Sequence, residues 1–154
     1  MGFFGSIFGR KREPAPPPDL NAIKDSLENL TAFCGDVQRL IGADAFVRDG
    51  MEKQVLSAYA FGGVNVLSQQ RGLGAPHAHA IIVALLQKSF GYSAGDSAAK
   101  AQALIDATGD RRSSLNAITH RGIDGFLAWQ KDRAAFDAAD FRDVLMKLRR
   151  KPPA

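Results

Sequence analysis

The chain has 154 residues, of which 45% are hydrophobic and 23% are charged, and its formal net charge is +4. A chain of this length buries roughly 68–70% of the surface that its unfolded form exposes, so one domain is expected to fold without a disulfide or a structural metal. Its longest almost apolar run, residues 78–86, is far shorter than the roughly 20 residues that cross a bilayer, which argues against an integral membrane protein.

The excess positive charge lies at the two ends of the chain. Residues 1–19 contain three basic residues against two acidic ones, and residues 142–154 contain five against one, which leaves residues 20–141 with a net charge of −1. A nucleic-acid-binding domain normally gathers its basic residues on one face of the fold. The sequence therefore does not favour DNA or RNA as a partner.

The first 18 residues read as a flexible tail and linker. They divide into an apolar group, a basic triplet and the proline-rich stretch Pro14-Ala-Pro-Pro-Pro18, which favours an extended spacer over packed structure. The apolar group precedes the basic one, the reverse of the order in a secretory signal, and the single cysteine, Cys34, can form no internal disulfide. These features predict a protein of the reducing cytoplasm.

The same tail suggests an alternative function, a helical adaptor held at the inner face of the membrane. Met1-Gly-Phe-Phe-Gly-Ser6 formally fits the N-myristoylation pattern, and basic residues follow it. One acyl chain gives only marginal attachment and each basic residue adds about 1 kcal/mol, so such a tether would be weak and reversible. The candidate membrane contacts are Phe3, Phe4, Ile7, Phe8, Arg10, Lys11 and Arg12.

Residues 19–149 are expected to form one helical domain, beginning with a long amphipathic helix. Apolar residues recur every three or four positions between Leu20 and Leu40, and Asp19 is suited to cap the first turn.

A second helix is expected after Gly50, opened by a capping box of Asp49 and Glu52. It contains Gly62 and Gly63 in mid-helix, which cost on the order of 1 kcal/mol each relative to alanine. We expect the close approach of another helix, or a kink, to compensate for this cost. An opening of the backbone for a ligand is the functional alternative.

Four further helices complete the domain. The segment from Ala75 carries proline in its first turn and is apolar on nearly every side through residues 78–86, as expected of a helix surrounded by others. Later helices are expected after a cap at residues 93–96, after Ser113, and from Asp137 to Asp140. We predict an all-α bundle of about six helices, a short basic tail at residues 150–154, and one core that contains Ile81, Ile82, Leu85, Leu86, Leu104, Ile118 and Trp129.

Metal and phosphate sites find little support in the sequence. His77 and His79 are two positions apart, about 200° around a helix, so they cannot share a metal as an i, i+4 pair can. Gly72-Leu-Gly74 lacks the preceding strand and the third glycine of a phosphate-binding loop, and it predicts a turn. We expect no metal and no cofactor.

One catalytic pairing stays open, a nucleophile formed by Cys34 with His120. No neighbouring cation or helix start marks Cys34 as a reactive thiol, so a buried core residue is the better interpretation. The sequence favours a binding protein over an enzyme.

A resemblance to a known family rests on four segments: Tyr59-Ala-Phe-Gly-Gly-Val-Asn65, Gly72-Leu73, Leu104-Ile-Asp-Ala-Thr108, and Ile118-Thr-His-Arg-Gly-Ile-Asp-Gly-Phe126 with Trp129. Over roughly residues 50–131 the chain resembles immunity protein 48, a family of immunity proteins from bacterial polymorphic toxin systems. The resemblance implies an all-α cytoplasmic protein that binds and neutralises a cognate toxin.

Exposed carboxylates are the candidate contacts with such a toxin, and a solvated helix face is the alternative interpretation of each. Immunity proteins that block basic nucleases are often strongly acidic, which a body of net charge −1 does not match, so a nuclease partner is not favoured. The candidate contacts are Asp106, Asp110, Asp124 and Asp132.

Overall fold

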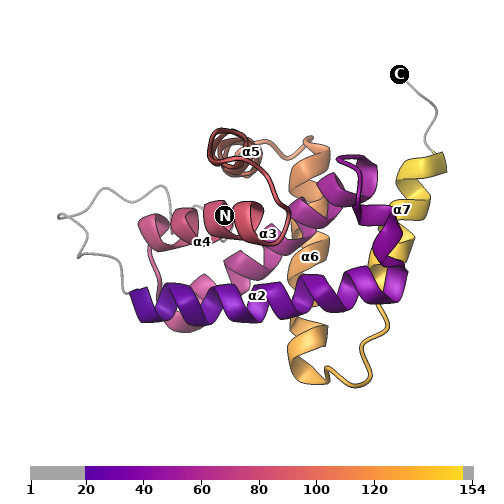
Figure 1. Ribbon diagram of the computed structural model, residues 1–154, viewed down its shortest axis with the longest axis horizontal. Coiled ribbons are helices and arrows are strands. Elements are labelled where there is room, and N and C mark those ends of the chain that lie inside the picture. The colour runs from indigo at the N-terminus through magenta and orange to yellow at the C-terminus, as the bar shows by residue number, and fades with distance from the viewer. Residues whose placement is uncertain (1–19, 151–154) are drawn as a thin grey trace.

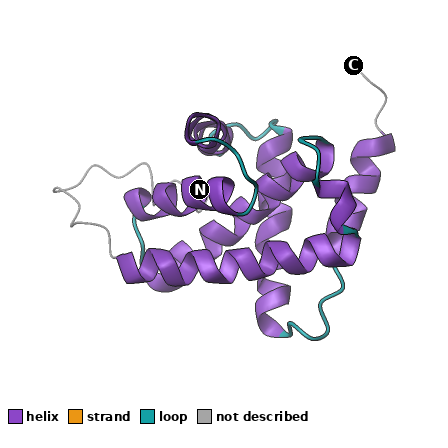
Figure 2. Ribbon diagram, viewed as in Figure 1, coloured by secondary structure: helices purple, strands orange, loops and turns teal. Residues whose placement is uncertain are grey.

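The computed structural model describes residues 20–150, and within that range the chain is helical with no strand (Figures 1 and 2). The elements are α2 (Leu20–Ile41), the 3-10 helix η1 (Ala43–Phe46), α3 (Met51–Arg71), α4 (Ala75–Lys88), α5 (Ala94–Ala107), α6 (Ser114–Lys131) and α7 (Ala139–Arg150). The prediction of an all-α bundle of about six helices is confirmed. The predicted tail at residues 1–18, the proposed membrane contacts and the Asp19 cap lie outside the described residues. So does the predicted tail at residues 150–154, apart from Arg150, which ends α7.

Helix α3 lies at the centre of the bundle. All its residues from Val55 to Ser68 are buried, and α2, α4 and α6 pack against it. The long helix α2 runs across the molecule in Figure 1, and α6 crosses behind it. The seven residues predicted to share one core are all buried and belong to one hydrophobic cluster.

Helix α4 packs against α2, α3 and α5, as predicted for a helix surrounded by others, although one side of it remains open to solvent. It buries one face, with Ala78, Ile81 and Leu85 inaccessible to solvent, while His79 is exposed. Its remaining apolar residues include small side chains such as Ala80 and Ala84, which sit partly exposed at little cost. The central position of α3 is not evident from its sequence, because the helix carries polar residues. Three of them, Ser57, Asn65 and Ser68, are nevertheless buried.

The mid-helix glycines of α3 allow close contact with α6, as the sequence predicted. A Cβ placed on Gly62 would lie 2.5 Å from the backbone nitrogen of Ile123, and one placed on Gly122 would lie 2.7 Å from the carbonyl carbon of Tyr59. The two backbones therefore touch where both helices carry glycine. A side chain at either position would force the helices apart, and this packing compensates for the flexibility of the glycines.

The helix caps agree with the sequence in part. The Ser93 side chain accepts a hydrogen bond from the backbone N–H of Asp96 at 3.1 Å, as predicted for the start of α5. The predicted capping box of α3 is wrong, because Gly50 is the N-cap residue and no side chain caps it. Asp49 instead accepts a hydrogen bond from the Tyr92 hydroxyl, and the carboxylate of Glu52 pairs with Arg149.

Candidate partner-binding site

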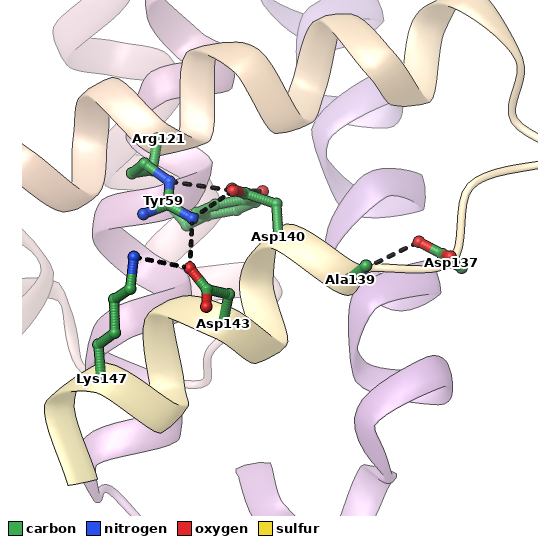
Figure 3. A network of polar contacts seen from close by, with 7 residues as sticks. All are labelled: Tyr59, Arg121, Asp137, Ala139, Asp140, Asp143 and Lys147. Atoms are coloured by element: carbon green, nitrogen blue, oxygen red, sulfur yellow. Dashed lines mark hydrogen bonds and ion pairs between the residues drawn. The ribbon is translucent and has the colours of Figure 1, made fainter. Parts of the chain in front are cut away.

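The contact between α6 and α7 is organised by a network of polar side chains (Figure 3). Arg121, on α6, donates from Nε to Asp140 Oδ1 at 2.9 Å and from Nη2 to Asp143 Oδ2 at 2.9 Å. Tyr59, on α3, donates its hydroxyl to the other oxygen of Asp140 at 2.8 Å, and Lys147 Nζ lies 3.0 Å from Asp143. Three helices are thus held together by one guanidinium and two carboxylates.

The protonation states in this network are fixed by its contacts. Burial, followed by the charge of Asp140, raises the pKa of Tyr59 well above its ordinary value, so its hydroxyl remains a donor. Hydrogen bonds to Asp140 and Asp143 raise the pKa of Arg121, and hydrogen bonds from Arg121 and Lys147 lower the pKa of Asp143. The network clamps α7 in place, with Tyr59 and Arg121 as donors and Asp143 as an acceptor.

Beside this network lies an open groove, which we call the α6–α7 groove. Its volume is about 370 Å³, and it is formed by the second half of α6, the connection to α7 and the first residue pair of α7. The apolar part of its lining is Gly125, Ala128, Ala135, Phe136 and Ala139, and the polar part is Asp124, Asp132, Asp137 and Asp140.

The four carboxylates of the groove differ in the groups that they contact. Asp140 is paired with Arg121, whereas Asp132 and Asp137 only accept a hydrogen bond each, from the backbone N–H groups of Ala135 and Ala139. Asp124 is exposed, and its carboxylate makes no hydrogen bond or ion pair with another residue of the range 20–150. Three carboxylates therefore line the groove without a cation paired to them inside the described fold.

The structure brings two of the four predicted contact residues together. Asp124 and Asp132 both line the α6–α7 groove, while Asp106 and Asp110 do not. The Asp106 carboxylate accepts a hydrogen bond from Gln102 at 2.8 Å, and Asp110 accepts one from the backbone N–H of Arg112 at 2.9 Å. Asp137 and Asp140 were predicted only as a helix start, and no signal in the sequence indicated that they line the groove.

The proposed pairing of Cys34 with His120 has no support in the fold. Cys34 is 1% exposed within the core, and burial raises the pKa of its thiol to about 12, so it is a protonated core residue at neutral pH. His120 is exposed on α6.

The described range, residues 20–150, contains neither a cluster of metal ligands nor a membrane-spanning helix. No group of three or more His, Cys, Asp or Glu side chains in this range is placed to hold a metal ion. No helix in the same range is both long and apolar enough to cross a membrane.

The family described as immunity protein 48 matches residues 26–149. This range takes in most of α2 and extends through nearly all of α7, and so is wider than the segment that carries the resemblance in the sequence motifs. No curated protein and no solved structure matches the chain.

Proposed function

The chain belongs to the immunity protein 48 family, and from that premise we propose that it neutralises a cognate bacterial toxin in the cytoplasm by stoichiometric binding, with no catalysis of its own. The family match over residues 26–149 is the observation that carries the proposal, because immunity proteins of toxin systems act on a toxin partner. Function of this kind needs a surface on a stable scaffold and no reactive group.

The packing of the domain supports such a role. The backbones of α3 and α6 touch at Gly62 and Gly122, while Arg121 holds α7 against α6 and the Tyr59 hydroxyl holds it against α3. A binding surface carried by elements fixed in this way loses little conformational freedom when a partner binds, which favours affinity.

We place the toxin contact at the α6–α7 groove. Asp124 and Asp132 are its proposed contact residues, since their carboxylates are exposed and are not paired with a cation inside the described fold. Charges of this kind attract an oppositely charged partner and orient it during association. Asp106 and Asp110 are weaker candidates because they lie outside the groove.

We expect expression of this chain to restore growth of cells that produce a toxin encoded beside its gene. Protection should survive in Cys34→Ala, His77→Ala and His120→Ala, because none of these side chains takes part in the proposed binding. Colony counts with and without induction of the toxin measure the effect. Loss of protection by a His120→Ala protein that still folds would contradict a purely binding role.

The groove predicts a specific pattern of affinities. The double substitution Asp124→Asn with Asp132→Asn should weaken toxin binding about tenfold at low salt, equivalent to about 1.4 kcal/mol, and by less at high salt because salt screens exposed charges. The matched control is Asp106→Asn with Asp110→Asn, which removes the same charge elsewhere and should leave the affinity unchanged. An equal loss in both double variants, measured by calorimetric titration, would refute the placement of the contact.

A further inference from the structure

A second pocket, with no lining residue in common with the α6–α7 groove, lies where α3, α5 and the start of α6 meet. Its volume is about 200 Å³, which is the size of a small ligand or of one side chain. Ala103, Leu104 and Leu115 form the apolar part of its lining, and Gln54, Ser57, Tyr92 and Lys100 form the polar part.

The ring of Tyr92 holds two ammonium groups, and one of them belongs to Lys100, which lines this pocket. Lys53 Nζ lies 4.5 Å from the ring centroid and Lys100 Nζ lies 4.6 Å from it. The ring itself is fixed, because its hydroxyl donates to Asp49 at 2.6 Å and Phe90 stacks on it nearly in parallel. Attraction to the face of a ring positions a cation without using up its N–H donors.

Neither lysine makes the ion pair that its sequence position offers. Asp96 lies four residues before Lys100 on α5, the spacing at which acidic and basic side chains commonly pair on a helix, and Asp49 lies four residues before Lys53 but precedes α3. No carboxylate of residues 20–150 forms an ion pair with either ammonium group, and no acceptor in that range receives a hydrogen bond from them. Both ammonium groups therefore keep free donors, and that of Lys100 belongs to a residue that lines the pocket.

We propose that this pocket, which we call the lysine–tyrosine pocket, binds a carboxylate carried on a short aliphatic stem. The ammonium group of Lys100, supported by that of Lys53, holds the carboxylate, while Leu104 and Leu115 contact the stem. The carboxylate of Asp49, which accepts the hydrogen bond of the Tyr92 hydroxyl, lowers the positive charge around the pocket without forming an ion pair with either lysine, so the pocket favours an acid of single negative charge over a dianion such as phosphate. A glutamate side chain of a bound partner and a free small acid both supply this chemistry.

Butyrate is the probe that tests the pocket, because it is one carboxylate on a short apolar stem. Titrated into the full-length, isotope-labelled chain, it should shift the backbone amide signals of Ser57, Leu104 and Leu115, with a dissociation constant on the order of millimolar for so small a ligand. Lys100→Met keeps the stem and removes the charge, and it should weaken binding at least tenfold. The matched control Lys88→Met removes a charge on α4, outside the pocket, and should leave binding unchanged.

Two comparison ligands make the proposal refutable. Butylamine has the same stem with the opposite charge and should cause no shift, and inorganic phosphate should shift these amides far less than butyrate does. The absence of a butyrate shift in the folded protein, or equal shifts with butylamine or phosphate, would overturn the proposal. This experiment contains no toxin, so its failure would leave the proposed immunity function standing.

A last comparison separates the two sources of the carboxylate once butyrate binding is established. If the natural ligand is an acidic side chain of the toxin, Lys100→Met should weaken the toxin complex as well as butyrate binding. If it is a free small acid, the same variant should bind the toxin with unchanged affinity.

Discussion

Replacing Gly122 by alanine is expected to lower the free energy of unfolding by about 3 kcal/mol, or to prevent folding altogether. The added Cβ would collide with the backbone of Tyr59, and a backbone cannot rotate away as the end of a flexible side chain can. The two central helices would have to separate, which also loosens the aromatic core beside them. Urea denaturation followed by circular dichroism measures the change.

Gly35→Ala is the matched control for this effect. Gly35 is exposed in the middle of α2, and a Cβ placed there has nothing within 4 Å. The same chemical change should therefore raise the free energy of unfolding by about 0.5–1 kcal/mol, since alanine is the better helix former. Similar stabilities of the Gly122→Ala and Gly35→Ala proteins would contradict the close contact of α3 with α6.

Leu85→Ala is expected to cost about 2–5 kcal/mol, because it removes a fully buried side chain and leaves a cavity. Leu127→Ala removes the same atoms from a position on α6 that is 44% exposed, and its effect should stay within about 0.5 kcal/mol. A loss below roughly 0.5 kcal/mol for Leu85→Ala, measured in the same denaturation experiment, would show that α4 adds little to the core.

The helices were predictable because each carries its own apolar periodicity. Which helix is the most deeply buried was not predictable. Helix α4 is more apolar than α3, yet α3 is the central helix. The serines and the asparagine of α3 are buried because neighbours from other parts of the chain enclose them. The glycines of α3 predicted a close contact, but only the fold identifies Gly122 of α6 as the partner. Tertiary packing decides both points, and it leaves no local signal in the sequence.

The α6–α7 groove was harder to predict from the sequence than the helices were. Its shape depends on how the chain turns between α6 and α7, where Ala138 adopts a left-handed conformation with φ of 59° although neither glycine nor asparagine marks the position. Asp140 looked like part of a helix start, and its partners Tyr59 and Arg121 lie 81 and 19 residues away. Asp124 and Asp132 were identified as exposed carboxylates, but only the fold places them on one groove.

The lysine–tyrosine pocket had no sequence signal either. Lys53 belongs to α3 and Lys100 to α5, and the spacing of neither residue indicates that they meet at one ring. Tyr92 lies between the two lysines in the sequence, and only the fold brings both ammonium groups to its ring.

Titration of the purified toxin with the full-length chain tests the proposed mechanism of immunity most directly. Toxin activity should fall in proportion to the amount of chain added and reach its minimum at one equivalent, with both proteins recovered intact as a complex. Complete inhibition by a small fraction of an equivalent would show turnover and contradict stoichiometric binding. Full toxin activity in the presence of excess folded chain would contradict the immunity function itself.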